Sequence, residues 1–251
     1  MVGTADKAGG MSGCRKSALI GLAILVGAIG FVWWRWFPSY TYHQKITVTV
    51  EAGGKEYSAS SVTAVTWQYG PQLLAEVKRA TATLEGEAVH LELPGGKHLF
   101  ALLRVDTTGT NSGLAYYIDI TGMAHATYPE FSKNIYWPSD VSKQRGVREI
   151  PPSDRPLLIT FGDLLRPETV RIVNPDNLAA TFGIGTQLKS LTLDITDDPV
   201  GLPTVEAILP WLRHYSEMGF RLSGTTCVAC SVRDAPLSQM LGTGEFWRIN
   251  R

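Results

Sequence analysis

The sequence predicts a mainly β domain, antiparallel and sandwich-like with one or two small helices, that follows one N-terminal transmembrane helix. Three observations lead to this prediction. They are an uncharged apolar run near the N-terminus, several segments in which apolar and polar residues alternate, and short glycine-containing turns between such segments. Strands joined by short turns pair antiparallel, whereas a parallel sheet needs connections of about a dozen residues or more.

The apolar run suits a helix that crosses a lipid bilayer. Residues 18–34 carry no charge, and at a rise of 1.5 Å per residue they make about 25 Å of helix. The run ends in an aromatic cluster around one arginine, formed by Trp33, Trp34, Arg35 and Trp36. Indole rings favour the membrane interface, and an arginine can extend its guanidinium to the headgroups. We therefore expect residues 18–37 to be a signal-anchor helix in the bilayer.

Two alternatives remain for this run. A cleaved signal peptide is one, because Ala28 and Gly30 offer small residues at a cleavage site. The apolar sequence continues past that point, which favours an uncleaved anchor. A buried core helix is the other alternative, but so long a run without a polar stripe is rare in a soluble domain.

Basic residues set the expected orientation of the anchor. They are Lys7, Arg15 and Lys16 before the run, and Arg35 and Lys45 at its end or after it. This bias keeps the short basic tail, residues 1–17, in the cytoplasm and places the β-rich domain, residues 40–251, outside it. A start at Met11 would retain two of the three preceding charges, so the prediction of a single-pass inner or plasma membrane protein does not depend on the first codon.

The first half of the outer domain predicts two hairpins. Lys45–Val50 alternates strictly, so that Ile46, Val48 and Val50 face a core, and the turn AGGK leads to a second strand at 56–67. The second hairpin covers 88–105 around PGGK, with an inward row at Val89, Leu91 and Leu93. A short helix is expected at 73–82 between the hairpins.

Residues 106–155 change in character, with many prolines and glycines and the aromatic stretch YPEFSKNIYWPSD. Only 115–120 predicts a strand there. A loop of this length is either a binding surface or poorly ordered. The alternative without a binding role is a structured surface loop whose Tyr and Trp side chains cover the sheet.

The second half predicts further strands and small helices. The strands are LLITF at 157–161, residues 170–173, residues 188–196 with Leu191, Leu193 and Ile195 on one face, and the short segments FRLSG and EFWRI. A short helix near Ala179 is expected to begin at Asp176 or Asn177 and end at Gly183 or Gly185. An amphipathic helix is expected at 204–218, capped by Thr204 and kinked at Pro210.

The segment NPDNLAATFGIGTQLKSLTLDITDDPV, the following ILPWL, and the earlier SSVTAV and GEAVHLELPGGKHLFALL resemble a group of membrane-anchored bacterial proteins with no assigned activity. The resemblance covers most of residues 40–215. It implies a single anchored domain and no catalytic role.

Charge argues against partners selected by a global electrostatic field. Lys plus Arg and Asp plus Glu both total 23, so nucleic acid and acidic substrates are not expected partners. The expected partners are the bilayer, through residues 18–37, and a protein or a second copy of the chain. Ala23 and Gly27 form a small-xxx-small pair that suits helix association.

Cys227 and Cys230 form the one motif with intrinsic chemistry, TCVAC. In an oxidising compartment a local disulfide is the favoured interpretation, and a redox site or free thiols are the alternatives. A thioredoxin-like helix would be stopped at Pro236, and the five histidines show no zinc-ligand spacing.

Asp194, Asp197 and Asp198 form a weak candidate for a hard-cation site, against the favoured alternative of a solvated turn. No other catalytic motif is present, and no cofactor is expected. The sequence therefore favours a non-catalytic binding or envelope-assembly module, with a thiol-dependent redox factor or a carboxylate-dependent hydrolase of the envelope as the alternative.

Overall fold

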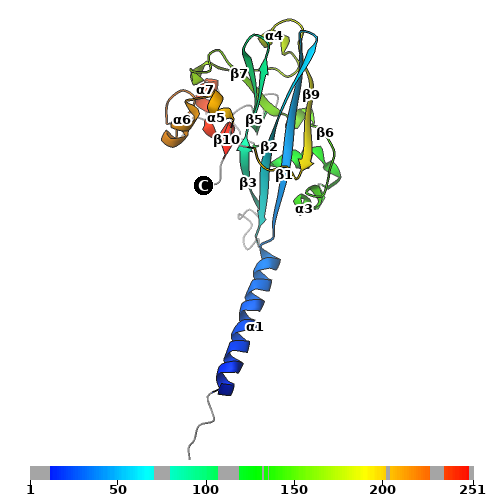
Figure 1. The fold of residues 1–251 in the computed structure, drawn as a ribbon, viewed down its shortest axis with the longest axis vertical. Coiled ribbons are helices and arrows are strands. Elements are labelled where there is room, and N and C mark those ends of the chain that lie inside the picture. The colour runs from blue at the N-terminus through cyan, green and yellow to red at the C-terminus, as the bar shows by residue number, and fades with distance from the viewer. Residues whose placement is uncertain are drawn as a thin grey trace, which may run out of the picture. The chain divides into compact units, whose positions relative to one another are not determined.

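A computed structural model describes residues 12–70, 80–106, 119–131, 133–134, 136–201, 204–226 and 235–248, with side chains of 12–17 and 32–36 excepted. The chain is mainly β, with two antiparallel sheets and small helices around them (Figure 1). The prediction of a mainly β, sandwich-like fold is confirmed. The short α-helices α2–α7 exceed the one or two that the sequence predicts.

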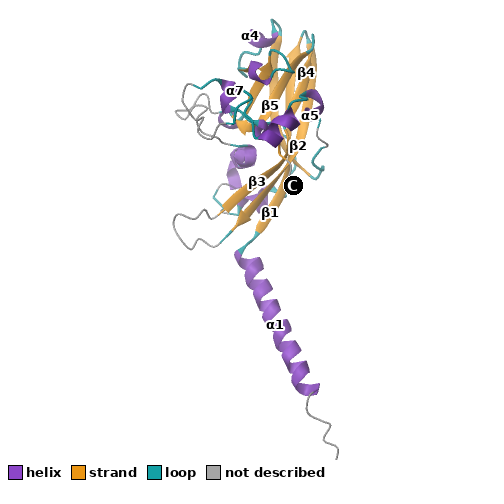
Figure 2. Ribbon diagram, turned by 90° about the vertical axis from the view of Figure 1, so that its left-hand side faces the viewer, coloured by secondary structure: helices purple, strands orange, loops and turns teal. Residues whose placement is uncertain are grey.

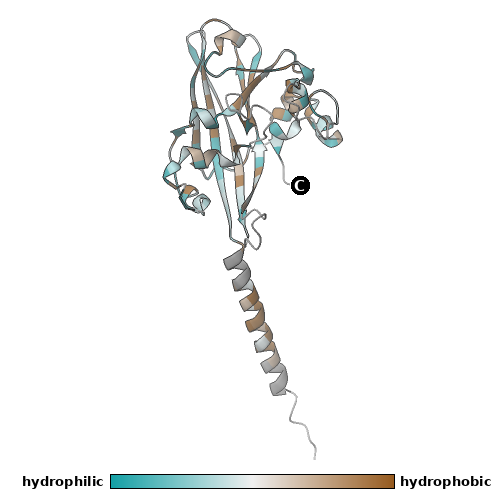
Figure 3. Cartoon of the chain, turned by 180° about the vertical axis from the view of Figure 1, so that it is seen from behind, coloured by the Kyte–Doolittle hydropathy of each residue, from teal (hydrophilic) through white to brown (hydrophobic). Residues whose placement is uncertain are grey.

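The N-terminal helix α1 runs from Ser12 to Trp36, and Figure 3 shows its central part as strongly hydrophobic. Its large apolar side chains are exposed on all sides: Leu19, Ile20, Leu22, Ile24, Leu25, Val26, Ile29 and Phe31. Within the described residues, no helix combines the length and hydropathy needed to cross a membrane. The predicted interface residues Trp33, Trp34, Arg35 and Trp36 lie outside the residues whose side chains are described.

The larger sheet has the strand order β10-β3-β2-β1-β9-β6. Its strands are β1 (Ser39–Ala52), β2 (Lys55–Tyr69), β3 (Ala80–Glu87), β6 (Arg148–Glu149), β9 (Thr186–Thr196) and β10 (Trp247–Arg248). β1 lies in the middle and pairs antiparallel with β9 from His43 to Ala52. The sheet therefore joins the first strand of the domain to one that follows more than a hundred residues later.

The alternation predicted for β1 and β9 is confirmed. Ile46, Val48 and Val50 are at most 3% exposed, and the three predicted inward residues of β9 are at most 1% exposed. Gly53 and Gly54, at the turn after β1, both have positive φ, a conformation that glycine adopts without a Cβ clash. This is the turn that the sequence AGGK predicts.

The smaller sheet has the order β4-β5-β7-β8. Its strands are β4 (Val89–Leu93), β5 (Lys97–Val105), β7 (Pro156–Phe161) and β8 (Val170–Ile172). β4 and β5 form the second predicted hairpin, with Val89 opposite Ala101 and Leu93 opposite Lys97. Nearly every residue of β5 and β7 is buried, because both faces of this sheet are covered.

Two hydrophobic cores cover those faces. The first contains the inward residues of both sheets, such as Val48, Leu191, Leu99 and Leu158. The second lies on the other face of the smaller sheet and joins Phe100 and Ile159 to residues of the C-terminal helices. Figure 2 shows α5 and α7 over this face.

The C-terminal helices are α5 (Val205–Ile208), α6 (Leu212–Met218) and α7 (Leu237–Met240). The sequence predicts one kinked helix over 204–218, but Pro210 divides it into α5 and α6. Proline lacks the amide hydrogen and its ring clashes with the preceding turn. The side chain of Thr204 does not cap α5. Instead, the Glu87 carboxylate accepts hydrogen bonds from the amides of Thr204 and Val205, at 2.7 and 2.9 Å, and from the Thr204 hydroxyl at 2.7 Å.

The described part of 106–155 folds against the sheets. It contains α2 (Met123–Thr127) and α3 (Trp137–Val141). Tyr128 is fully buried and Trp137 is 7% exposed, both in the first core. This arrangement agrees with the interpretation that the aromatic residues cover the sheet.

Three local predictions need correction or lie outside the described residues. Residues 80–82 begin strand β3, whereas the sequence predicts the end of a helix there, and 71–79 are outside the described residues. Ile120 begins a 3-10 helix where a strand is predicted, and 115–118 are outside. FRLSG contributes a single bridge, between Arg221 and Gly242, in place of a strand. The conformation of each of these short segments depends on the residues that surround it in the folded chain.

Candidate functional site

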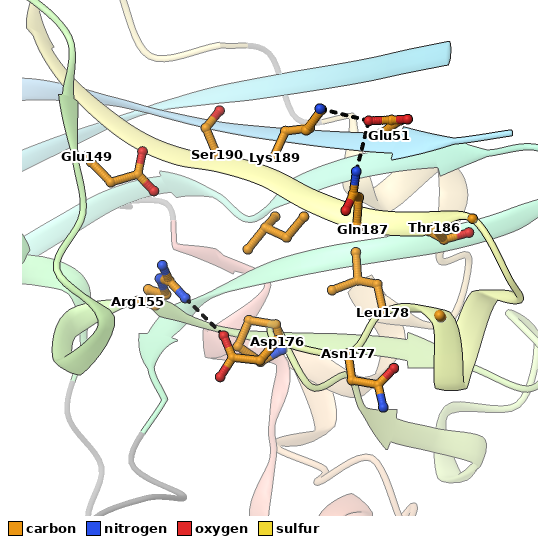
Figure 4. Close-up of a pocket in the computed structure, with 14 residues that line it drawn as sticks. Glu51, Glu149, Arg155, Asp176, Asn177, Leu178, Thr186, Gln187, Lys189 and Ser190 are labelled. Carbon is orange, nitrogen blue, oxygen red and sulfur yellow. Dashed lines mark hydrogen bonds and ion pairs between the residues drawn. The ribbon is translucent and has the colours of Figure 1, made fainter. Parts of the chain in front are cut away.

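A pocket of about 600 Å³ lies along one edge of β9. One wall is the N-terminal half of β9 with the residue before it, Gly185–Ser190, and the facing wall is formed by Pro175–Ala179 and Arg155. Figure 4 shows β9 crossing the view, with Arg155, Asp176 and Asn177 on the side of β9 away from Glu51 and Lys189.

This edge of β9 is open because β6 is very short. β6 pairs only Arg148 and Glu149 with Leu193 and Thr192, and Ile150 adds one hydrogen bond from its amide to the Leu191 carbonyl, at 2.9 Å. The next two residues are Pro151 and Pro152. Proline has no amide hydrogen to donate to a strand neighbour, so the pairing stops there.

A side chain occupies the next hydrogen-bonding position along this edge. Glu149 accepts a hydrogen bond from the Leu191 amide through Oε1, at 3.2 Å. A carbonyl of a neighbouring strand would otherwise take that place. The Leu191 amide shows that the backbone of β9 directs hydrogen-bonding groups toward the side on which the pocket lies.

The floor of the pocket is apolar. Leu178 is 1% exposed and belongs to the first core, and Leu188 packs against the same core while half-buried. Leu178 is held by the turn before α4 (Ala179–Phe182), in which Asn177 Oδ1 accepts from the Ala180 amide at 3.2 Å. Of the helix ends that the sequence predicts, Gly183 is confirmed as the C-cap, with φ of 98°. The N-cap is Leu178 instead of Asp176 or Asn177.

Charged side chains surround the floor and pair with one another. Lys189 Nζ lies 2.8 Å from Glu51 Oε2, and Gln187 donates to the same oxygen at 3.0 Å. These hydrogen bonds lower the pKa of Glu51, which therefore stays ionised near neutral pH. On the other wall, Arg155 Nη1 lies 3.6 Å from Asp176 Oδ1, and Asp176 is 84% exposed. The second pair is loose and open to solvent.

The predicted carboxylate cluster does not converge on one point. Asp194 accepts from the Gly146 amide at 3.1 Å, Asp197 pairs with Arg145 at 2.6 Å, and Asp198 pairs with Lys45 at 3.3 Å. Within the described residues, no group of three or more His, Cys, Asp or Glu side chains is placed to hold a metal ion. The three carboxylates instead contact Gly146, Arg145 and Lys45 separately.

Cys227 and Cys230 lie outside the described residues, so the disulfide and redox predictions remain predictions.

The structure joins two histidines that the sequence analysis treats as scattered. His90 Nε2 and His98 Nδ1 are 2.9 Å apart, and the rings are stacked with centroids 5.2 Å apart. Burial and then the charge of His98 lower the pKa of His90 to about 4. The hairpin register would have revealed the pair, because His90 lies opposite Phe100 and His98 opposite Glu92, which places the two rings diagonally on one face.

A second group of charges is buried. Glu245 is 3% exposed and accepts from the Gly242 amide at 2.9 Å, and Arg104 Nη1 lies 3.9 Å from Glu245 Oε1. Burial raises the pKa of the Glu245 carboxyl, against the opposing effects of the Gly242 amide and of Arg104 and Arg221. This group lies inside the fold, so its placement suits a structural role.

No protein family model, curated protein or solved structure matches this chain. The functional interpretation therefore depends on the geometry of the pocket and on the character of α1.

Proposed function

We propose that the chain is a single-pass membrane protein whose outer β domain is a non-catalytic module that binds a partner in the pocket along β9. The observation that carries the proposal is the exposure of apolar side chains all round α1. The second support is a pocket with an apolar floor, a charged rim and an unpaired sheet edge.

The exposed side chains of α1 favour a lipid surrounding. Removing a large apolar side chain from water contributes about 1.5–3 kcal/mol, and eight such side chains of α1 are between 55% and 67% exposed. They lie on every side of the helix, whereas a helix that packs on a protein surface keeps one polar face. The residues with described side chains, 18–31, are fewer than the about 20 that a span needs. The proposed anchor therefore also uses 32–37, as in the sequence prediction.

The composition of the pocket favours binding over catalysis. Of the described residues that line it, none is histidine or cysteine, the side chains that most often act as general base or nucleophile near neutral pH. Two of its three carboxylates are already paired with cations, and the lowered pKa of Glu51 makes it a poor proton donor. The alternative of a carboxylate-dependent hydrolase gains nothing from Asp194, Asp197 and Asp198, since each is engaged by a different group.

Fractionation of cells that express the full-length chain tests the anchor. The chain should stay in the membrane pellet after extraction with alkaline carbonate. A double variant, Leu22→Arg with Leu25→Arg, should move to the supernatant, because each charge at the centre of a span costs about 2.5–3.5 kcal/mol on insertion scales. The matched control is Val147→Arg with Leu165→Arg, which alters two residues of the β domain with similar exposure, 67% and 69%. Full-length wild-type chain in the carbonate supernatant would overturn the proposal.

A further inference from the structure

We infer that the pocket takes one extended polypeptide segment, which adds to β9 as the missing edge strand and directs one apolar side chain onto Leu178 and Leu188. The inference rests on the proposed function, since it names the partner of the same pocket. It follows from the backbone of β9, the length of its open edge and the nature of the pocket floor.

The first step concerns the backbone of β9. Among the described strands, β1 is the only neighbour of β9 between Thr186 and Ser190, because β6 ends at Glu149 and its hydrogen bonding stops with Ile150. Amide and carbonyl groups without a strand neighbour form a template for a further strand. The Thr186 amide donates to the Gly183 carbonyl at 3.2 Å, so the template consists of the backbone groups that follow it. The carboxylate of Glu149, which takes up the Leu191 amide, marks where the existing pairing ends and an added segment would begin.

The second step concerns dimensions. Thr186–Ser190, the open part of β9, spans about 17 Å at a rise of about 3.3 Å per residue, and a paired strand lies about 4.8 Å away. Five residues of an added segment would match this length. The facing wall at Pro175–Ala179 bounds the pocket on its other side.

The third step separates a segment from a second copy of this chain. Two folded domains that join edge to edge need long, flat and regular strands. Here Thr49 pairs with Ser190 and Val50 with Leu188, so Lys189 is an extra residue that forms a bulge. The facing wall at Pro175–Ala179 also stands in the way of a second folded domain, whereas a flexible segment can enter beside the wall.

The fourth step concerns side chains. Alternate residues of an added strand point to opposite faces, so every second side chain faces the core side of the sheet, where Leu178 and Leu188 lie. Leu178 is already buried, so one apolar side chain there would cover the half-buried Leu188. Main-chain hydrogen bonds would supply affinity and this contact would supply selectivity, as in strand addition generally.

The test uses the full-length chain in detergent micelles and a displayed library of random heptapeptides. The best binder is synthesised with N-methyl groups on the odd-numbered amides and, separately, on the even-numbered amides. We expect one of these two peptides to lose at least about tenfold in affinity and the other to bind as before, because only alternate amides of an added strand face β9. The unequal response identifies main-chain pairing.

A pair of protein variants locates the site. Ala179→Trp places a large side chain in the facing wall and should weaken the peptide at least about tenfold. Ala180→Trp changes the next residue of α4, which is exposed and does not line the pocket, and should bind as the wild type does. Unchanged melting temperatures of both variants would show that neither effect comes from unfolding.

Three outcomes overturn the inference. If both methylated peptides bind as well as the parent while Ala179→Trp abolishes binding, the pocket is a binding site without strand addition, and the proposed function survives. If the library yields no binder, or if Ala179→Trp has no effect, the pocket takes no peptide segment. A concentration-dependent dimer that Ala179→Trp abolishes would identify a second copy as the occupant. The membrane anchor is judged separately by the carbonate extraction.

Discussion

The ion pairs around the β9 pocket and the ion pair between Arg104 and Glu245 place the same chemical groups in opposite surroundings. Asp176 is 84% exposed and lies 3.6 Å from Arg155, whereas the side chains of Arg104 and Glu245 are 3% and 4% exposed and lie 3.9 Å apart. Water screens the first pair, so its partners can be exchanged at little cost. The second pair is shielded from water, so the loss of one of its charges costs more stability than it does at the surface. The charges that are available to bind a ligand therefore lie on the pocket wall, and the charges that stabilise the fold are buried in the interior.

The largest effect is expected from Glu245→Ala. The change removes a carboxylate that lies near the buried guanidinium of Arg104 and accepts from the Gly242 amide, so the free energy of unfolding should fall by about 3 kcal/mol. Urea denaturation measures this change. The control Glu206→Ala, which breaks the exposed pair with Arg213, should shift the midpoint only slightly. Equal shifts for the two variants would remove the distinction between buried and exposed pairs.

A smaller effect is expected from Glu87→Ala, because this carboxylate is only half-buried. It accepts three hydrogen bonds at the start of α5, and loss of such a cap costs about 1–2 kcal/mol. Thermal unfolding of the variant should show the loss, and amide exchange should increase at Thr204 and Val205. Glu85→Ala, on the same face of β3, is the matched control. Protection at Thr204 and Val205 that equals the wild type would contradict the capping role.

The histidine pair should make stability depend on pH. The pKa of His90 is lowered to about 4 in the folded chain and is about 6.5 when unfolded, so the unfolded state binds more protons between these values. The contribution of His90 is thus complete above pH 6.5 and is lost as the pH falls toward 4. After allowance for partial exposure, we expect it to amount to about 1 kcal/mol.

Urea unfolding of the wild type and of His90→Gln at pH 7 and pH 4.5 measures this contribution. The difference in the free energy of unfolding between the two proteins isolates His90, because the carboxylates titrate equally in both. His98 and Glu92 are the charged neighbours that adjust the pKa of His90. If the stability difference between the two proteins is the same at both pH values, the pair does not act in this way.

The smallest effect is expected from Asp176→Asn on the pocket wall. An exposed pair contributes about 0–1 kcal/mol, and the 3.6 Å separation favours the lower end. Stability should therefore stay within about 0.5 kcal/mol of the wild type, as measured by urea denaturation. A larger loss of stability would mean that the ion pair between Arg155 and Asp176 holds the fold together. It would weaken the assignment of these two residues to a binding site.

The predictable parts of the fold were the strands that bury only one of their two faces. The alternation in β1 and β9 predicted which residues are buried, and the glycine turns predicted both hairpins. β3 was not predicted, because its sequence, ATATLEGE, has few large apolar residues and its place depends on β2 and β10. The helix at 204–218 was predicted as one element, whereas Pro210 ends α5 and begins a new turn.

The candidate site was predicted least well, because its walls are distant in the chain. Asp176 and Asn177 were expected only as helix caps, and Arg155 attracted no prediction, although all three line the pocket with Gly185–Ser190. The sequence PP at 151–152 was a usable signal, since two prolines must end a strand. The two prolines do not indicate which neighbouring strand is left with an unpaired edge.

By itself, the sequence determined the alternating strands, the turns between them and the apolar character of 18–37, because side-chain periodicity and glycine conformations are local properties. Only the tertiary structure decided that β6 stops beside β9, that His90 meets His98, and that Arg104 and Glu245 share one buried site. Each of these depends on register and packing between segments far apart in the chain, and local sequence carries no record of such distances.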